Sequence, residues 1–434
     1  MSDISPCDGA STRSSLYRKI DVRVLALLTV SYGFAYLDRV NIGFAKLQMQ
    51  SSLGLSDAVY GLGAGIFFLG YIAFEIPSNL LLPRIGARKT FSRIMVLWGL
   101  TSVSMIFVHD RYSFCTLRLL LGIFEAGFAP GMIYYLASWY PRTRRARTMA
   151  IVLCASPVAG LIGGPVSGWA MTGLAGVAGL PGWQWLFLVE GMPSIVLGIL
   201  VWFYLADHPG DVRWLSREEK ALHENDLHSA GCPYHGSFRC VLTDLKIWRM
   251  AAAYFCMISG LYAIGFWLPS ILKSAGQKDV MTIGLYSAIP YAAAIATMYA
   301  LGRHSDRHRE RRWHSAIALF LGAVAFSFVA LGHERFAVAL IAITFATALI
   351  YAAYIVFWAM ASDYLTGDVA AGAIALVNSV GLVGGLVSPT TIGWLSATTG
   401  SMRGGLLAVV AMLVAGSMLV ALERVPGIHI VRAS

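Results

Sequence analysis

Long apolar stretches, separated by short polar connections, recur along nearly the whole chain. A membrane-spanning helix needs roughly 20 predominantly apolar residues, and the chain contains twelve stretches of this kind. The repetition excludes a protein with a single membrane anchor and predicts an all-α membrane protein. The predicted transmembrane spans are residues 22–46, 58–82, 90–109, 112–140, 147–174, 183–205, 248–272, 280–301, 313–331, 336–361, 369–398 and 403–423.

The longest polar stretch lies between the sixth and seventh predicted spans, from Asp207 to Lys246. Within it, Ser216 is followed three positions later by Glu219, the spacing of a capping box that starts a short surface helix. The N-terminal region has no cleavable signal pattern, so the first span is expected to remain in the mature protein. We therefore predict two pseudo-symmetric six-helix bundles, at residues 1–206 and 248–434, joined by a linker at residues 207–247.

The composition agrees with the bilayer as the main solvent, since 57% of the residues are hydrophobic and only 13% are charged. The net charge of +10 is concentrated in alternate connections, and cation-rich connections face the cytoplasm. This placement argues against nucleic-acid binding and predicts a bacterial inner-membrane protein with both termini in the cytoplasm. The cations are Arg84, Arg88, Lys89 and Arg93 after the second span, Arg142, Arg144, Arg145 and Arg147 after the fourth, and Arg303, Arg307, Arg309, Arg311 and Arg312 after the eighth.

Two of these connections share a sequence pattern, which an internal repeat explains. The segment Gly302-Arg-His-Ser-Asp306-Arg307, followed by Glu310-Arg311-Arg312, comes after the eighth span, and Asn79-Leu-Leu-Leu-Pro83-Arg84-Ile-Gly86-Ala-Arg88-Lys89 comes after the second. The pattern resembles the loop signature of the major facilitator superfamily. That resemblance implies a gating role for Arg84, Gly86, Arg88, Gly302, Asp306 and Arg307. The first copy has Pro83 where the family usually has Asp, which argues against a charge lock there.

Further segments in both halves resemble the anion:cation symporter family within that superfamily, which carries tartrate, phthalate, sugar acids and hydroxyphenylacetate. The segments are Tyr36-Leu-Asp-Arg-Val-Asn-Ile-Gly, Gly70-Tyr-Ile-Ala-Phe-Glu-Ile-Pro-Ser-Asn79, Arg118-Leu-Leu-Leu-Gly-Ile-Phe-Glu-Ala-Gly127, Gly182-Trp-Gln-Trp-Leu-Phe-Leu-Val-Glu-Gly191, Phe266-Trp-Leu-Pro269 and Asn378-Ser-Val-Gly-Leu-Val-Gly-Gly. The resemblance extends over nearly the whole chain.

The ionisable residues inside the predicted spans can also be interpreted without the family. Each costs roughly 2.5–3.5 kcal/mol on insertion scales, so such residues usually face the bundle interior and have a function. Arg118 and Glu125 are seven residues apart and share one helix face, roughly 10 Å apart along the axis. Asp38 and Arg39 are adjacent, so their side chains leave the helix about 100° apart. The complete set is Asp38, Arg39, Glu75, Arg118, Glu125 and Glu190.

Two arginines and two carboxylates suit a symporter that carries an anion together with protons. An arginine fork can bind a carboxylate through two hydrogen bonds, and a carboxyl group can hold and release a proton. Structural pairing between the acids and the arginines is the alternative for these residues. Glu75 and Glu190 are interpreted mainly as structural, because each precedes a proline-containing bend or span end.

The resemblance assigns roles residue by residue. It implies that Arg39 holds the substrate carboxylate, that Asp38 and Glu125 carry protons and that Arg118 is their switching partner. Four further residues match family positions that line the central cavity, with packing as their alternative role: Tyr36, Tyr71, Trp358 and Asn378. Some relatives of this family with multiply charged substrates have another arginine in the seventh span, and the range Ala252–Leu272 contains none, which argues against a strongly polyanionic substrate.

Other motifs are interpreted as structural. The glycines at 160–168 and 61–65 lie inside apolar helices, where they permit close helix packing rather than phosphate binding. The six cysteines form no dense framework. Cys232-x-x-His235 with Cys240 lacks a fourth well-placed ligand, so no metal site and no cofactor are predicted.

The sequence thus predicts a proton-coupled symporter that imports a small organic carboxylate by alternating access, working as a monomer in the lipid bilayer. A hydroxylated sugar acid or a dicarboxylate such as tartrate is favoured over an aromatic acid. An organic-anion antiporter or exporter is the alternative, because the Gly-Pro motif of the fifth span is compatible with it. An intramembrane enzyme is disfavoured, because all ten histidines lie in connections or at span ends.

Overall fold

The computed structural model describes residues 6–228, 242–332, 335–364 and 370–423, which are helical and contain no strand. The helices of the first half are α1 (Pro6–Ile20), α2 (Ala26–Val40), α3 (Ile42–Leu53), α4 (Asp57–Ile85), α5 (Ala87–Ser104), α6 (Arg111–Glu125), α7 (Phe128–Trp139), α8 (Arg142–Leu153), α9 (Ala155–Gly173), α10 (Gly182–Tyr204) and α11 (Arg217–His228). Those of the second half are α13 (Leu245–Ser274), α14 (Val280–His308), α15 (Arg312–Leu331), α16 (Phe336–Tyr364), α17 (Ala370–Thr399) and α18 (Arg403–Leu422). A π-helical turn η1 (Asp21–Leu25) joins α1 to α2, and 3-10 turns occur at η2 (Met105–Phe107), η3 (Val177–Gly179) and η4 (Pro209–Asp211).

Twelve helical segments of the described chain are long and apolar enough to cross a membrane. The predicted fold class, an all-α membrane protein with twelve spans, is therefore confirmed. One boundary differs clearly from the prediction, because α14 continues to His308 instead of ending near residue 301. The polar residues at its end remain helical until Arg309, whose left-handed conformation (φ 51°) terminates the helix.

The contacts within the chain divide it into two compact units, residues 1–53 with 66–232 and residues 54–65 with 233–434. The boundary after residue 232 falls within the predicted linker, but residues 54–65 group with the second unit although they belong to the first half of the sequence. Their packing on α17 explains this grouping. Thr390 Oγ1 donates to the Gly61 carbonyl at 3.3 Å, and Ser396 Oγ donates to the Asp57 carboxylate at 2.5 Å.

Glycines permit this close approach of α4 to α17, as the sequence predicts for the glycines at 61–65. A Cβ atom added to Gly61 would lie 2.9 Å from Gly393 Cα, and one added to Gly65 would lie 2.7 Å from the Leu386 carbonyl oxygen. Both contacts are shorter than real Cβ atoms show. A side chain at either glycine would therefore force the two helices apart.

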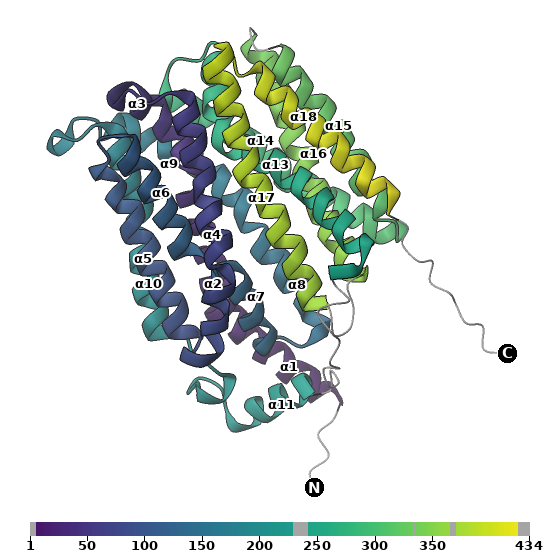
Figure 1. Cartoon of the computed structure of the whole chain (residues 1–434). Helices are drawn as coiled ribbons and strands as arrows, with labels where there is room; N and C mark the ends of the chain where they lie inside the picture. Colours follow the sequence, from purple (N-terminus) through teal and green to yellow (C-terminus); the bar gives the residue numbers. More distant parts are fainter. Residues whose placement is uncertain (1–5, 229–241, 333–334, 365–369, 424–434) are drawn as a thin grey trace. The chain divides into compact units, whose positions relative to one another are not determined.

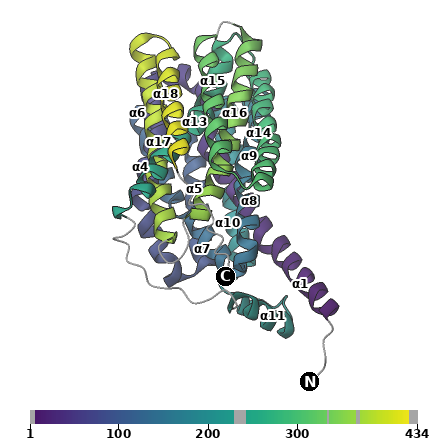
Figure 2. The same cartoon turned by 90° about the vertical axis from the view of Figure 1, so that its right-hand side faces the viewer.

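In the first unit, α5 and α10 lie side by side over much of their length (Figure 1). A Cβ atom on Gly99 of α5 would lie 2.9 Å from the Ile195 nitrogen of α10. In the second unit, α16 packs closely against both α14 and α15 (Figure 2). Small residues thus bring helix backbones together in both units, as is common where van der Waals packing drives association in a bilayer.

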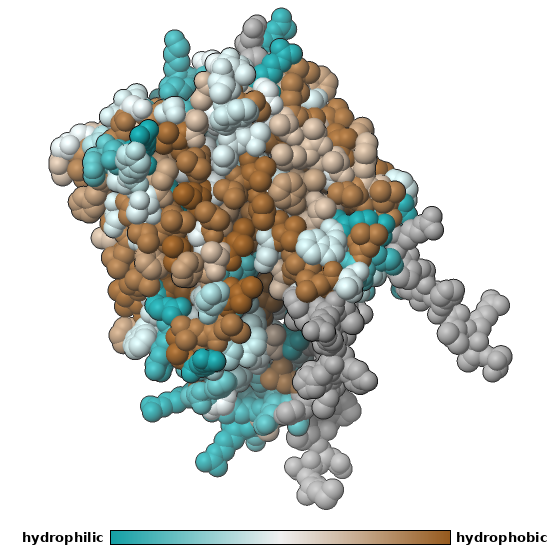
Figure 3. Space-filling model, in the orientation of Figure 1, coloured by the Kyte–Doolittle hydropathy of each residue, from teal (hydrophilic) through white to brown (hydrophobic). Residues whose placement is uncertain are grey.

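The outward faces of the helices carry large apolar side chains. Phe203 and Tyr204 on α10 are 74% and 75% exposed, and Leu80 on α4 is 67% exposed. Figure 3 shows such hydrophobic side chains covering much of the visible faces of the helices, with hydrophilic ones gathered near the helix ends. Lipid tails can cover this surface, whereas water would not favour it.

The predicted capping box in the linker is confirmed. Ser216 Oγ accepts from the Glu219 nitrogen at 3.1 Å, and the Glu219 carboxylate accepts from the Ser216 nitrogen at 2.9 Å, at the start of α11. Glu219 also binds Lys19 of α1 at 2.6 Å. Although burial raises its pKa, the hydrogen bond from Lys19 and the one from Ser216 lower the pKa of Glu219 overall. The helix is therefore attached to α1 by charge as well as by its cap.

Candidate functional site

Asp38 lies at the end of α2 and is only 1% exposed. Its carboxylate accepts three hydrogen bonds, from Ser102 Oγ at 2.7 Å, Ser194 Oγ at 2.6 Å and Trp98 Nε1 at 3.1 Å. Trp98 and Ser102 belong to α5 and Ser194 belongs to α10, so the acid connects three spans. Among the described residues, the contacts of the Asp38 carboxyl group are with neutral donors and not with a charged partner.

Arg39, the next residue, points to a different neighbour. Its guanidinium forms an ion pair with the Glu125 carboxylate at the end of α6. Arg39 is 6% exposed and Glu125 is 1% exposed, so the pair is almost completely removed from solvent. The pair joins the first and fourth spans. The divergence of Asp38 and Arg39 follows from the rotation of about 100° between adjacent helical residues.

Arg118 completes the charged cluster. It is 0% exposed, and its charge acts on the Glu125 carboxylate. The aromatic ring of Phe67 lies close to both arginines, with ring centroid distances of 5.1 Å to Arg39 Cζ and 5.2 Å to Arg118 Cζ. The ring of Tyr71 lies 5.5 Å from Arg39 Cζ. Such contacts attract a guanidinium to the face of a ring.

Close packing of α4 on α6 places these aromatic rings beside the arginines. A Cβ atom added to Gly122 would overlap the Phe67 carbonyl, and one added to Gly70 would lie 2.6 Å from the Leu119 carbonyl oxygen. On another side of the site, a Cβ atom on Gly163 of α9 would overlap the side chain of Leu37, the neighbour of Asp38. For Gly163, this contact confirms the packing role predicted for the glycines of the fifth span.

The fourth span, predicted as one helix, is broken directly after Glu125. Helix α6 ends there, Ala126 is extended (ψ 132°), and Gly127 has a φ of 88°, so α7 starts as a new helix. A Cβ atom on Gly127 would also lie 2.5 Å from Ser78 Oγ. Non-helical backbone at such depth is tolerated only when protein surrounds it, and both linking residues are buried. Glu125 thus sits at a discontinuity of its span.

The four residues predicted to line a cavity have different surroundings. Tyr36 on α2 is 7% exposed, and Tyr71 on α4 is 3% exposed and lies next to Arg39. Trp358 and Asn378 belong to the second unit. Trp358 is half-buried and its ring meets the Tyr254 ring edge-on, with centroids 5.0 Å apart. Asn378 is half-buried on α17.

The structure brings together Asp38, Arg39, Tyr71, Arg118 and Glu125 in the first unit. Sequence reasoning did not find the three donors to Asp38 or the ring of Phe67. Serine, tryptophan and phenylalanine are common in apolar helices, so their type alone does not mark them. Only a helix-by-helix docking of α5 and α10 on α2 would identify which ones face the acid.

The other two buried acids have separate surroundings. Glu190 on α10 is 1% exposed and accepts a hydrogen bond from Ser167 Oγ of α9 at 2.7 Å, and the side chain of Asn41 lies beside it. Glu75 on α4 is 6% exposed. Because Glu190 connects α9 to α10 through a neutral partner, its surroundings agree with the structural role predicted for it.

The loop pattern of the first half holds an acid from elsewhere in the same unit. Gly86 has a φ of 89°, and a Cβ atom there would lie 2.6 Å from the Asp207 carboxylate. Asp207 Oδ1 accepts from the Arg88 nitrogen at 2.9 Å, so it caps the start of α5. Arg84 is exposed at the end of α4. The first copy therefore uses Gly86 to admit a capping carboxylate that follows the sixth span.

The loop pattern of the second half forms surface ion pairs. Arg311 binds Asp306 at 3.5 Å and Asp363, at the end of α16, at 3.0 Å. A Cβ atom added to Gly302 would meet nothing within 4 Å. Arg307 is exposed. The two copies of the pattern thus have different local structures, and the gating roles predicted for their residues stay predictions.

The cysteine and histidine motif of the linker, Cys232, His235 and Cys240, lies outside the described residues.

Known proteins are similar to this chain over most of its length. A family model described as Major Facilitator Superfamily matches residues 28–389. The chain is 43% identical over 409 residues to "Putative metabolite transport protein NicT" of Pseudomonas putida, covering 94% of both chains.

Two further relatives have more specific names. The chain is 43% identical to "Putative tartrate transporter" of Agrobacterium vitis, over 92% of this chain and 93% of the relative. It is 38% identical to "Quinolone resistance transporter" of Acinetobacter baumannii, over 93% of both chains. These similarities extend over nearly the full length of each protein.

Proposed function

Because the chain belongs to the major facilitator superfamily and is a membrane transporter, we propose that it imports a small organic carboxylate together with protons. The observation that carries this proposal is the buried cluster of Asp38, Arg39, Arg118 and Glu125. Its members are between 0% and 6% exposed. Burying four ionisable groups in a membrane protein costs free energy, so such groups usually have a function.

The charges of this cluster give a reason for coupling. Two arginines and two ionised acids sum to zero, so adding a carboxylate alone would leave one buried negative charge uncompensated. Adding one proton with one carboxylate restores zero. A buried uncompensated charge costs several kcal/mol, which favours joint loading of proton and anion. A monocarboxylate would then travel with one proton, and a dicarboxylate would need a second.

Arg39 is the proposed binding residue for the substrate, and Glu125 is its internal competitor. While Glu125 is ionised, it occupies the guanidinium of Arg39. When Glu125 takes up a proton, it no longer needs that partner, and the guanidinium fork becomes available to a substrate carboxylate. Arg118, which acts on the same acid, is the proposed switching partner. Asp38, held by three neutral donors, is the second proposed proton carrier.

The proposed substrate is a hydroxylated sugar acid or a dicarboxylate such as tartrate. Tyr71 beside Arg39 and Tyr36 on the same span as Arg39 offer hydroxyl groups for hydrogen bonds, and Asn378 is proposed as a further contact. A relative with 43% identity is named a tartrate transporter, which supports this class. An aromatic acid is the alternative, because the rings of Phe67 and Tyr71 also offer stacking surfaces.

The direction of transport is a separate question. The relative named a quinolone resistance transporter favours export as a second candidate function. Import by proton symport and export by proton antiport respond oppositely to the same pH gradient. We further propose that the protein lies in the bacterial inner membrane with both termini in the cytoplasm, since the cation-rich connections agree with that orientation.

Uptake into proteoliposomes tests this proposal. Radiolabelled tartrate, a sugar acid and an aromatic acid are offered with an acidic exterior, with and without a protonophore. Accumulation above the external concentration that the protonophore abolishes is expected for at least one carboxylate. Accumulation driven only by an acidic interior would support export instead. Equilibration without dependence on the pH gradient would contradict proton coupling.

A further inference from the structure

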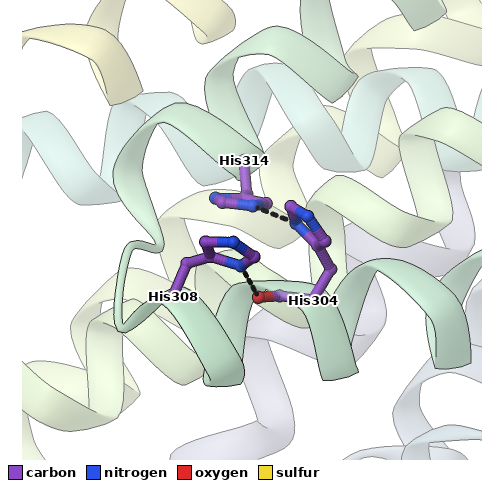
Figure 4. Close-up of side chains that lie close together, drawn as sticks. All are labelled: His304, His308 and His314. Atoms are coloured by element: carbon purple, nitrogen blue, oxygen red, sulfur yellow. Dashed lines mark hydrogen bonds between the residues drawn. The ribbon is translucent and has the colours of Figure 1, made fainter.

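Three histidines meet where α14 ends and α15 begins, in the second unit. His304 and His308 are one helical turn apart on α14, so they lie on one face, and His314 faces them from the first turn of α15. One potential ligand atom from each of the three lies within 4.8 Å of the others. Figure 4 shows the three rings grouped together.

Hydrogen bonds fix which nitrogen of two of these rings carries a proton. The Nδ1 atom of His308 lies 2.9 Å from the His304 carbonyl oxygen, which can only accept, so Nδ1 of His308 donates. The Nδ1 atom of His314 lies 2.6 Å from the Glu310 carboxylate and donates likewise. In their neutral forms, both rings therefore present an unprotonated Nε2. Zinc-binding histidines in proteins are usually oriented in this way by a carbonyl or a carboxylate.

The third ring already faces one of these lone pairs. His304 Nδ1 lies 2.7 Å from His314 Nε2, so one of the two nitrogens must offer its lone pair to the other. Two nitrogens bound to one tetrahedral ion at 2.0–2.1 Å lie about 3.4 Å apart. A metal ion thus requires the two rings to separate by less than about 1 Å. His304 is exposed, so its side chain has room for this movement.

The connection that leads into α15 and His314 is held in place by its own hydrogen bonds. Ser305 Oγ donates to the Glu310 carbonyl at 2.7 Å, and the Glu310 carboxylate accepts from the Trp313 nitrogen at 2.7 Å. Glu310 therefore caps α15 and orients His314 at the same time. Because these bonds fix the turn, binding requires little ordering of the chain.

Two of the surrounding arginines are held by partners other than the three histidines. Arg311 is directed to Asp306 and Asp363, with nitrogen–oxygen distances of 3.5 Å and 3.0 Å. Arg303 donates to the hydroxyl of Tyr299 at 3.2 Å. The nearest carboxylate to the imidazoles is that of Glu310, which contacts His314. Its negative charge offsets part of the repulsion that a divalent cation would meet.

We propose that His304, His308 and His314 bind one divalent transition-metal ion of the zinc class. Imidazole nitrogens suit zinc, copper and nickel, whereas magnesium and calcium prefer oxygen ligands. Three protein ligands leave a fourth position, which a water molecule fills. The ion ties the end of α14, which contains Asp306 and Arg307, to the start of α15. The site is independent of the proposed transport function.

The test measures zinc binding to the full-length protein, purified without a polyhistidine tag and freed of metal with a chelator. Calorimetry is expected to show one zinc ion per chain, and cobalt(II) is expected to give the visible absorption of a four-coordinate site. His308→Gln and His314→Gln are each expected to weaken zinc binding at least about 100-fold. Glu310→Gln keeps an acceptor for the cap of α15 and is expected to weaken binding about tenfold.

The matched control is His208→Gln, which changes an exposed histidine of the other unit and is expected to leave zinc binding unchanged. A second control, Cys232→Ser with His235→Gln and Cys240→Ser, removes the possible ligands of the linker motif. Loss of binding in that control, with unchanged binding in His308→Gln and His314→Gln, would place the ion in the linker and overturn the proposal. Absence of a zinc ion at millimolar concentration would overturn it as well. All substituted histidines of the cluster are exposed or half-buried, so the variants are expected to fold.

Discussion

The adjacent residues Asp38 and Arg39 have distinct partners. This separates the proposed proton-carrying role of Asp38 from the proposed substrate-binding role of Arg39. Asp38 is held by neutral donors from α5 and α10, whereas Arg39 pairs with an acid of the fourth span. The acid at 38 can therefore change its charge without directly removing the partner of the arginine. The arginine can exchange Glu125 for a substrate without losing its place beside Phe67.

Arg39→Lys tests whether the guanidinium is the substrate ligand. A lysine keeps the charge but cannot form two parallel hydrogen bonds with a carboxylate, so substrate affinity is expected to fall at least about tenfold. Calorimetry with the carboxylate found in the uptake assay measures this. Arg111→Lys, at an exposed position next to Tyr112, is the control and should bind normally. A lysine variant that binds within about twofold of the wild type would show that Arg39 is not the ligand.

Glu125→Gln separates coupling from binding. A permanently neutral residue at position 125 does not compete with the substrate carboxylate for Arg39, so substrate should still bind and exchange. Without a proton to release, the pH gradient should no longer drive accumulation. Counterflow and gradient-driven uptake are measured on one proteoliposome preparation, with Glu190→Gln as the control that keeps both activities. Gradient-driven accumulation close to the wild-type level in Glu125→Gln would leave Asp38 as the sole proton carrier.

The composition of the site could be predicted from the sequence better than its pairing could. Charged residues are rare within apolar spans, so Asp38, Arg39, Arg118 and Glu125 can be recognised by type alone. The ion pair between Arg39 and Glu125 could not be predicted, because it depends on how two distant spans dock. Spacing along one helix instead pointed to Arg118 and Glu125, which do influence each other.

At the scale of helices, apolar length predicted twelve spans, but it could not predict where a span breaks. The break after Glu125 depends on Gly127, whose sequence neighbours Ala126 and Phe128 are ordinary helix residues. A glycine inside an apolar helix more often permits packing, as Gly122 does against Phe67. Only the backbone conformation distinguishes the two uses, since Gly127 has a positive φ and Gly122 does not.

Gly127→Ala tests the break. An alanine at a positive φ costs roughly 1–2 kcal/mol, and its Cβ would also press on Ser78, so the unfolding temperature is expected to fall clearly. Gly302→Ala is the matched control, because a Cβ there meets nothing within 4 Å and the residue lies inside helix α14. That control should be neutral or slightly stabilising. Equal unfolding temperatures for both variants would argue that the backbone at Gly127 is helical.

At the scale of the whole molecule, the sequence places a division within the linker, and the grouping of contacts also divides the chain at residue 232. The sequence could not predict that residues 54–65 associate with the second unit. Those residues are apolar and glycine-rich like many spans, and their affinity for α17 arises from backbone contacts such as the one between Gly61 and Gly393. The glycines at 61–65 predict close helix packing, but they do not identify α17 as the partner.

The proposed orientation of the molecule in the membrane has its own test. Cation-rich connections are expected in the cytoplasm. The linker that carries α11 is expected on the same side as the N-terminus, because six spans, an even number, lie between them. Glu218→Cys places a thiol on the exposed face of α11 without disturbing the capping pair of Ser216 and Glu219. In a background without native cysteines, an impermeant maleimide should label it only after the cells are opened.

Lys278→Cys is the matched control for this labelling. Lys278 is exposed in the connection between α13 and α14, which is poor in cations and is expected outside, so the same reagent should label it on intact cells. Both variants remain in exposed connections, which makes the accessibility of the thiol depend on the side of the membrane rather than on burial. Labelling of Glu218→Cys on intact cells, with protection of Lys278→Cys, would reverse the orientation. Such a result would contradict the proposed topology but not the proposed import, because a proton symporter follows the proton gradient in either orientation.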